Sequence, residues 1–234
     1  MHKKIQNNTV RPKTTLFMLM SLDGKISTGS VDDRDFDKDF PNISGLEQGL
    51  YQYYDLEKRT DIHSFNTGRV MAKIGVNARK TPTTVLPCSF VIVDSSHLTA
   101  KGVLYLTKLT RKLYLITTNK KHPAFTINNA DNLQILYYPK LNLPKVFCDL
   151  RKKYGILRIT LQSGGTMNAE LLRNNLIDHI SLVVAPALIG GADTSTLVDG
   201  RSLATKMDLK NIKILKLKKC TVLKNSYLHL QYSL

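Results

Sequence analysis

The sequence predicts an α/β protein with a mostly parallel central sheet, flanked by helices and closed by an antiparallel edge at its C-terminal end. Short apolar, β-branched segments alternate with longer helix-like segments along the chain. No linker or internal repeat divides the 234 residues, and 42% of them are apolar, enough for a sizeable core. We therefore expect a single domain over residues 1–234, with residues 1–13 as an N-terminal extension.

The predicted strands are short and rich in apolar and β-branched residues. They are expected at residues 14–20, 61–65, 90–93, 112–117, 133–137, 157–161 and 180–185, with a terminal antiparallel pair at 212–217 and 222–231. The segment 157–161 is suited to a buried parallel strand.

Helices are predicted where apolar residues recur at helical spacing, at residues 46–58, 144–154 and 166–174. A shorter helix is expected to begin at the N-cap Thr67 and to stop at Gly75. Pro144 at the start of its helix and Gly155 beyond its end show the asymmetry typical of helices. Asp23-Gly24 predicts a tight turn after the first strand, and the Asp-rich residues 31–40 predict a loop.

The formal net charge of +16 raises the question of an anionic partner. In "KILKLK", residues 213–218, Lys alternates with apolar residues, so the lysines share one face of a strand. This pattern favours a solvated strand face over a nucleic-acid site. A third interpretation is a positive field that attracts small anionic ligands.

Membrane insertion and metal binding are not expected. No apolar run approaches the roughly 18–20 residues that span a bilayer, and "LFMLM" at 16–20 is too short for a signal sequence. The three cysteines are widely spaced and form no CxxC motif, which argues against a zinc site and against a disulfide framework. We expect a cytoplasmic protein that binds neither membrane nor nucleic acid.

The stretch "SGGTMNAELL" leads from a predicted strand into a predicted helix through two adjacent glycines. Ligands of open α/β sheets bind beyond the carboxyl ends of strands. A glycine lets a pyrophosphate approach the backbone at a helix N-terminus. The spacing is neither G-x-G-x-x-G nor a P-loop, so a plain turn remains an alternative.

Three motifs together resemble one family. "MSLDGKIS" (20–27), "FVIVDSSHLT" (90–99) and "SGGTMNAELLRNNLIDHISLVVAPALIGG" (163–191) are similar, in order and spacing, to the reductase domain of riboflavin biosynthesis, which has a dihydrofolate-reductase-like fold. The resemblance covers residues 14–203. It implies an NADPH-dependent reductase that converts the ribose of a ribosylamino-pyrimidine phosphate to a ribityl chain. The substrate is then either 5-amino-6-(5-phosphoribosylamino)uracil or a 2,5-diamino-6-ribosylamino-pyrimidinone phosphate. A homodimer is also implied, with residues 185–191 and the terminal strands as its interface.

The resemblance further implies which residues contact NADPH. These are Asn66, Thr67, Gly68, Arg69, Thr117, Thr118, Ser163, Gly164, Gly165 and Thr166. In "TTNKK", residues 117–121, hydroxyl and ammonium groups are suited to a 2′-phosphate, although an exposed turn is the alternative.

The predicted catalytic residues are Asp23 and Lys25, at the end of the first strand. Asp23 would accept substrate hydrogen bonds or relay a proton, and Lys25 would neutralise the substrate phosphate or orient the substrate ring. A simple turn with a solvated lysine is the alternative. Substrate contacts are expected from Ser21, Asn77, Arg79 and Gln162.

The sequence departs from the family pattern at two places. An acidic pair followed by proline is missing from "MAKIGVNARK", residues 71–80, where Asn77 and Arg79 partly substitute, Arg79 as a phosphate fork. The usual glutamate of the late motif is Gln162, and one of its glycines is Ser163. These changes keep open a dihydrofolate-reductase-like paralogue that reduces a pterin, a folate or another small molecule.

Two features that the sequence lacks bear on its function. The H-x-E and P-C-x-x-C motifs of the zinc deaminase fused to many such reductases do not occur. A basic nucleic-acid-binding module is the third hypothesis. The absence of Trp, and of aromatic residues among the basic runs, counts against it.

Overall fold

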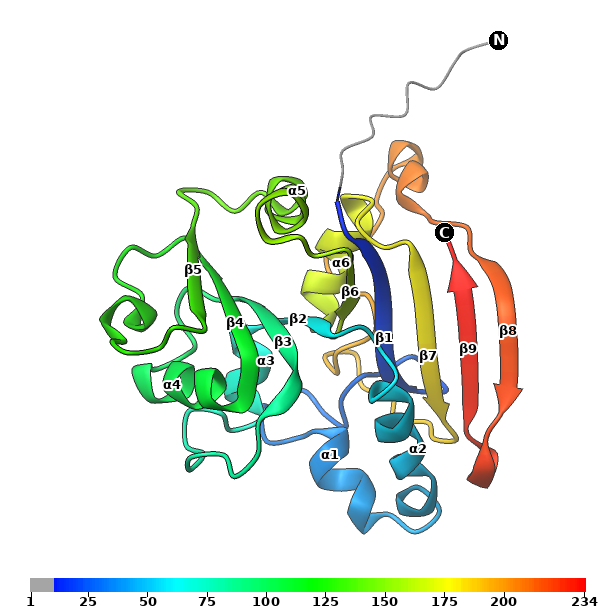
Figure 1. Cartoon of the computed structure of the whole chain (residues 1–234). Coiled ribbons are helices and arrows are strands. Elements are labelled where there is room, and N and C mark those ends of the chain that lie inside the picture. The colour runs from blue at the N-terminus through cyan, green and yellow to red at the C-terminus, as the bar shows by residue number, and fades with distance from the viewer. Residues whose placement is uncertain (1–10) are drawn as a thin grey trace.

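The computed structural model describes residues 11–234, and its centre is a nine-stranded sheet with the order β5-β4-β3-β2-β6-β1-β7-β9-β8 (Figure 1). The strands are β1 (Lys13–Ser21), β2 (His63–Thr67), β3 (Leu86–Val93), β4 (Thr110–Thr117), β5 (Leu133–Tyr137), β6 (Arg158–Leu161), β7 (His179–Ala185), β8 (Lys216–Val222) and β9 (Leu228–Ser233). The α-helices are α1 (Phe36–Asp39), α2 (Glu47–Glu57), α3 (Gly68–Lys73), α4 (Ala100–Leu109), α5 (Leu143–Tyr154) and α6 (Gly165–Arg173). Short 3₁₀ turns are η1 (Phe40–Asn42), η2 (Pro123–Thr126), η3 (Lys206–Asn211) and η4 (Lys224–Ser226).

The sheet is parallel from β5 through β7, and only β9 and β8 join it antiparallel. This arrangement confirms the predicted α/β class with its antiparallel C-terminal edge. Because parallel strands end at the same edge of a sheet, the loops after β1, β2, β3 and β6 gather there. That edge is where a ligand site is expected.

Apolar side chains pack on both faces of the sheet. One face is covered by α5 and α6, whose Phe147 and Leu171 pack with Leu16 of β1. The other face carries separate clusters, one under α3 and α4 and one under α1 and α2. Residues at the carboxyl ends of β2 and β6 line a cleft together with residues of α2 and α3. No described helix is both long and apolar enough to cross a bilayer.

Several local predictions are confirmed at the level of helix ends. The Thr67 hydroxyl accepts a hydrogen bond from the backbone N–H of Val70, as an N-cap does. Gly155 ends α5 in the left-handed conformation, with φ at 67°. Gly75 follows α3 with φ at 83°.

Other predictions were wrong in extent. Residues 36–40, part of the expected loop 31–40, are helical, because Asp35 caps α1 and the stacked rings of Phe36 and Phe40 are buried. The helix α4 was not predicted. Its N-terminus is capped by Thr99, whose hydroxyl accepts from the N–H of Gly102.

The terminal strands lie several residues later than predicted. Residues 212–215 precede β8, and the chain reverses at η4, where Asn225 and Ser226 adopt positive φ. The predicted strand 222–231 therefore contains the turn. The expected extension 1–13 lies largely outside the described residues, but Arg11 belongs to the fold. Its guanidinium forms two hydrogen bonds of 2.8 and 2.7 Å with Asp178.

Candidate active site

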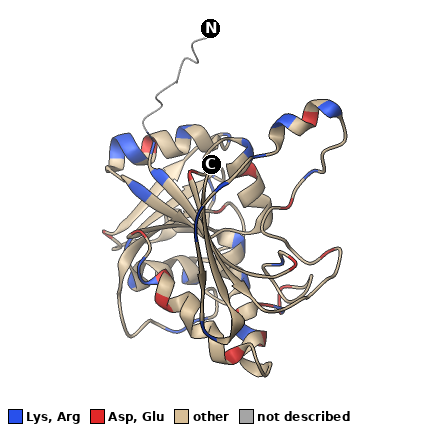
Figure 2. Ribbon diagram, turned by 90° about the vertical axis from the view of Figure 1, so that its right-hand side faces the viewer, with Lys and Arg blue, Asp and Glu red and all other residues tan. Residues whose placement is uncertain are grey.

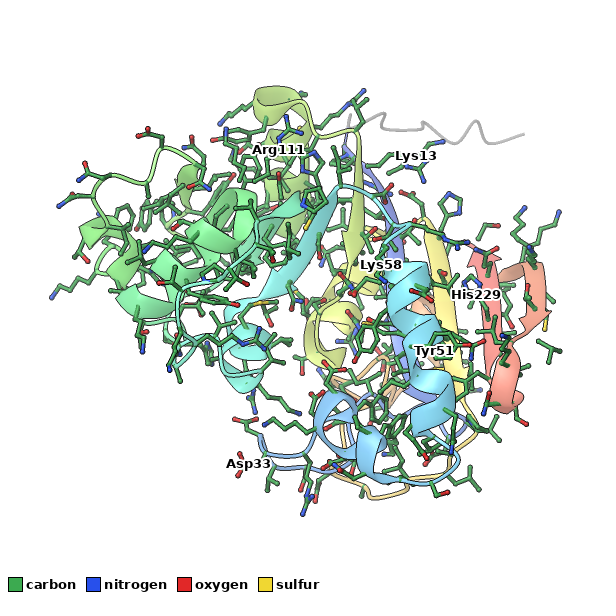
Figure 3. The ribbon with its side chains drawn as sticks, turned by 60° about the horizontal axis from the view of Figure 1, so that its bottom comes forward. Lys13, Asp33, Tyr51, Lys58, Arg111 and His229 are labelled. Carbon is green, nitrogen blue, oxygen red and sulfur yellow. The ribbon has the colours of Figure 1, made fainter. Side chains whose placement is uncertain are left out.

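A cleft of about 930 Å³ opens between α2 and α3, over the carboxyl ends of β2, β3 and β6. In Figure 3, Tyr51 and Lys58 mark α2, the helix that forms one wall of this cleft. The loop after β1 contributes Ile26 and Ser27 to the lining, and the loop after β6 contributes its glycine turn. The cleft therefore lies at the edge of the sheet where parallel strands place ligand-binding loops.

The glycine turn after β6 lines the cleft from Ser163 to Thr166. Ser163 donates a hydrogen bond of 2.7 Å to the Asn168 amide oxygen, which fixes the loop to α6. Gly164 occupies the N-cap of α6, and no side chain caps this helix. The first turn of α6, residues 165–167, lines the cleft, and its N–H groups have no side-chain acceptor.

The two glycines answer different steric demands. A Cβ on Gly165 would lie 2.3 Å from both the Asp199 carboxylate and the Thr196 carbonyl oxygen. A Cβ on Gly164 would meet only a methyl group of Val70, at 3.7 Å. Gly165 is thus required by the fold of this chain, whereas Gly164 leaves space in the cleft.

The opposite wall contains the predicted residues at the end of β2. Asn66, Thr67 and Arg69 all line the cleft. The Asn66 amide oxygen accepts from the N–H of Thr67 at 2.8 Å, and the Arg69 guanidinium lies 3.7 Å from Asp32. Gly68 does not present a cleft surface of its own, because its missing side chain makes room for Asp94.

Asp94, which was not predicted, organises the loop after β3. Its carboxylate accepts from the backbone N–H groups of His97 and Leu98, at 3.0 and 2.9 Å. The buried His122 donates to it at 2.8 Å. Burial alone would raise the pKa of Asp94, but these hydrogen bonds outweigh it and hold the pKa well below its ordinary value. The sequence signal was an Asp-Ser-Ser turn directly after a strand.

The predicted "TTNKK" turn supports this loop from behind. Thr118 shares a hydrogen bond of 2.9 Å with Ser95, and Asn119 donates to the Ser95 carbonyl at 2.9 Å. Thr117 is buried and accepts from the N–H of Asn119. The side chains at the cleft surface here are those of Ser95, Ser96 and His97.

Asp23 and Lys25, predicted as catalytic, hold a neighbouring loop. The Asp23 carboxylate accepts from the N–H groups of Ile189 and Gly190, the latter at 2.6 Å. The Lys25 ammonium donates to the carbonyls of Gly191 and Thr194 at 2.6 and 3.0 Å. Both side chains are therefore engaged with residues 189–194.

Ser21 belongs to the same arrangement, because its hydroxyl donates to Asp23. This hydrogen bond is the main cause that lowers the pKa of Asp23. The strand-like residues 24–26 pair with residues 195–197, and the Thr196–Asp199 turn packs against Gly165. Residues 21–26, 189–194 and 195–199 are thus connected to one another, and together they support the glycine turn.

Of the two residues predicted in the segment after α3, Asn77 connects loops and Arg79 lines the cleft. The Asn77 side chain bridges two loops, accepting from the N–H of Thr99 at 3.0 Å and donating to the His97 carbonyl at 2.8 Å. Arg79 lines the cleft and lies over the Tyr105 ring at 5.9 Å from its centroid. Lys73, which was not predicted, also lines the cleft.

Lys73 brings a positive charge to the middle of the cleft. Its ammonium lies 3.1 Å from the Ser27 hydroxyl and 3.8 Å from the Asp35 carboxylate. Burial raises the pKa of Asp35 from its ordinary value, and the nearby Lys73 partly opposes this rise. An ammonium group held this way can donate a further hydrogen bond to a phosphate oxygen.

The α2 wall is aromatic and carries one carboxyl group. Tyr53, Tyr54 and Glu57 line the cleft together with Gln162 and Ser64. Ser64 donates to the Gln162 carbonyl oxygen at 2.7 Å, and the Gln162 amide nitrogen donates to Glu57. Burial raises the pKa of Glu57, the Gln162 hydrogen bond opposes the rise, and the charge of Asp37 adds to it.

The amino-acid sequence matches a known protein family. The model of the RibD C-terminal domain matches residues 12–227. A 2,5-diamino-6-ribosylamino-4(3H)-pyrimidinone 5′-phosphate reductase of Methanothermobacter thermautotrophicus is 24% identical over 229 residues, covering 86% of this chain and 92% of the relative.

Solved structures share the fold. Acinetobacter baumannii RibD superposes with a TM-score of 0.66 at 16% identity over 95% of this chain. A deaminase/5-amino-6-(5-phosphoribosylamino)uracil reductase of Thermotoga maritima superposes with a TM-score of 0.62 at 12% identity, also over 95%. This chain spans 58% of the first protein and 56% of the second.

Proposed function

Because the chain belongs to the RibD C-terminal domain family, we propose that it is an NADPH-dependent reductase of a ribosylamino-pyrimidine phosphate. The reaction converts the ribosyl group to a ribityl chain. The observation that carries the proposal is one cleft in which the glycine turn after β6 faces an aromatic, carboxyl-bearing wall on α2. One side suits a dinucleotide and the other suits a flat, polar ring.

The glycine-turn side fits the cofactor pyrophosphate. Gly164 leaves open space, α6 has no side-chain cap, and Arg69 adds a positive charge. The hydroxyls of Ser95 and Ser96 are placed to receive the 2′-phosphate, with Thr118 behind them. When bound, NADPH supplies the hydride.

The remaining cleft holds the substrate. Tyr53 and Tyr54 offer ring faces for stacking, and Lys73 and Arg79 offer charge for the substrate phosphate. The amide of Gln162 lies between the cofactor side and the substrate side of the cleft. We assign Asp23 and Lys25 a positioning role, since their hydrogen bonds hold the loop that supports the glycine turn.

A pterin or folate reductase, the alternative suggested by the altered segment 71–80, is not favoured. The curated relative that aligns over most of this chain carries the name of a pyrimidinone phosphate reductase. The positive charges behind the net charge of +16 are not confined to one element. Figure 2, which views the molecule from the side of β8 and β9, shows Lys and Arg on several elements. This spread supports a small anionic substrate over a polynucleotide. We further propose a cytoplasmic homodimer.

The test is oxidation of NADPH by the purified protein, followed by absorbance. The substrate is 2,5-diamino-6-ribosylamino-4(3H)-pyrimidinone 5′-phosphate, with dihydrofolate in a parallel reaction and NADH in place of NADPH in a third. We expect turnover of the pyrimidinone only, and faster turnover with NADPH than with NADH. NADPH binding without turnover of any ribosylamino-pyrimidine phosphate would contradict the proposed substrate.

A further inference from the structure

We propose that Glu57 selects the 2-amino pyrimidinone ring over the corresponding 2-oxo ring, the uracil. The inference rests on the proposed function and concerns the ring end of the same cleft. It decides between the substrates that two similar reductases are named for, a 2,5-diamino-pyrimidinone phosphate and a 5-amino-uracil phosphate.

The hydrogen bonds around Gln162 orient the Glu57 carboxyl group. Ser64 donates to the carbonyl oxygen of Gln162, so the amide nitrogen of Gln162 faces Glu57. That nitrogen donates to Oε1 of Glu57 and lies 3.4 Å from the Tyr53 hydroxyl. Among the described residues, Oε2 of Glu57 accepts no hydrogen bond. One oxygen is thus held in place while the other stays free to act as an acceptor in the cleft.

The surroundings of Glu57 suit a flat ring. Tyr53 stacks on Phe17, with ring centroids 5.0 Å apart and planes 7° from parallel, which holds its ring in a defined position. Tyr54 and Phe36 line the same part of the cleft. A pyrimidine that lies against these side chains brings its edge to the carboxyl group at the end of α2.

The two rings differ in hydrogen-bonding character at one position. The 2-amino group is a donor and pairs with a carboxylate oxygen, whereas the 2-oxo group is an acceptor and would face that oxygen with its lone pairs. A site that presents a buried acceptor rejects the analogue without the donor, because the site's polar group is then left unpaired. The free oxygen of Glu57 therefore favours the diamino ring.

Protonation of Glu57 would reverse this preference, because a carboxylic acid donates a hydrogen bond to a carbonyl. The groups that face Glu57 are Asp37 from α1, Tyr53 and Tyr54 from α2, Cys88 from β3 and the neutral amide of Gln162. None of these side chains carries a positive charge. The preference for the diamino ring should rise with pH as Glu57 ionises.

The experiment compares kcat/KM for the diamino and uracil ribosylamino phosphates across a pH series. We expect the wild-type protein to prefer the diamino ring by about ten- to a hundredfold at neutral pH, with the preference falling in acid. Glu57→Gln should bring the ratio to one or below and remove its pH dependence, because the new amide oxygen accepts from Gln162 and leaves an NH2 donor facing the ring. The exchange variant E57Q/Q162E, which keeps one carboxyl and one amide in contact, should recover the preference for the diamino ring.

A second single variant guards against misfolding of Glu57→Gln. Gln162→Leu removes the donor that lowers the pKa of Glu57, so the midpoint of the pH dependence should move to higher pH while the diamino ring stays preferred at alkaline pH. Asp55→Asn, on the exposed side of the same helix, is the control and should behave as wild type.

The outcomes separate the two proposals. An unchanged substrate ratio and pH profile in Glu57→Gln, with the wild-type protein active, would overturn the role of Glu57 and leave the reductase function intact. A wild-type protein that binds NADPH but reduces neither ring would overturn the proposed function itself.

Discussion

Gly164 and Gly165 are consecutive, but their missing side chains have different consequences. Other residues of the protein fill the space beside Gly165, whereas the space beside Gly164 is open. The place of a Gly165 side chain is taken by Thr196 and Asp199 of the same chain. The backbone of Gly164, with φ at −70° and ψ at 161°, is one that any residue adopts. A glycine at position 164 is thus not needed for the fold, which agrees with the proposed cofactor site at this turn.

Matched alanine substitutions should separate these roles. Gly165→Ala should lower the free energy of unfolding by about 1–3 kcal/mol, because its methyl group meets backbone that cannot move freely. Gly164→Ala should leave stability unchanged or slightly higher but weaken NADPH binding by about tenfold, since a methyl group then blocks the approach to the helix N-terminus. Urea unfolding and titration of NADPH measure the two effects. Equal loss of stability in both variants would contradict the distinction.

At the scale of elements, Asp94 connects the end of β3 to the loops before α4 and after β4. His122 can serve it as donor because its other ring nitrogen accepts from the N–H of Ala124 at 3.0 Å, which defines the neutral form with the proton toward Asp94. Gly68 at the start of α3 packs against the Asp94 carboxylate, which occupies the space that a side chain at position 68 would need. The wall of the cleft that carries Ser95 and Ser96 depends on this carboxylate.

Asp94→Asn should destabilise the protein by about 2–3 kcal/mol at neutral pH, since hydrogen bonds to a buried charged acceptor are lost or weakened. The pKa of Asp94 is lower in the folded protein than in the unfolded chain. Its stabilising contribution is therefore complete above the unfolded pKa of about 3.9 and is lost as the pH falls toward the folded value.

Urea unfolding at a series of pH values measures this contribution. The difference between wild type and Asp94→Asn should shrink in acid. Asp55→Asn, which breaks only an exposed ion pair with Lys58, should stay within about 0.5 kcal/mol of wild type throughout. A constant difference across the acid range would show that the charge of Asp94 is not responsible.

At the scale of the whole molecule, apolar side chains gather at the C-terminal edge without cover. The segment that contains η3 projects from the body of the protein beside β8 (Figure 2). Ile214 is 90% exposed and Met207 is 76% exposed. The apolar residues of "KILKLK" are thus solvent-exposed like its lysines, and β8 has one unpaired edge. Exposed apolar surface of this kind is typical of protein–protein interfaces, which agrees with the proposed homodimer.

Light scattering should give the mass of a dimer for the wild-type protein at micromolar concentration. Ile214→Lys combined with Met207→Lys should shift it to the mass of a monomer, because like charges would then be buried without partners. Val85→Lys, at an apolar residue that is 66% exposed on another loop, is the control and should remain dimeric. A monomeric wild-type protein would contradict the proposal.

The sequence by itself determined the order and type of most elements, the α/β class and the position of the glycine turn. These depend on local physics: the alternation of apolar residues, capping by Thr67 and Gly155, and glycine beside a helix N-terminus. The ordered motifs also led to the family, which the match over residues 12–227 confirms. The helices α1 and α4 were missed. The four residues of α1 carry little local signal, and packing of Phe36 onto the sheet decides that segment, whereas α4 has a Thr99 cap and an apolar stripe that could have predicted it.

Only the tertiary structure decided what most polar side chains do. Asp23 meets its partner Gly190 across 167 positions of the chain, and Glu57 meets Gln162 across 105. A residue's role depends on the partner that folding brings to it, and no local pattern encodes a partner so distant. For this reason the sequence did not show that Asp23 and Lys25, whose catalytic role stays a prediction, hydrogen-bond to residues 190–194, nor that Glu57, an ordinary residue of a helix, lines the cleft.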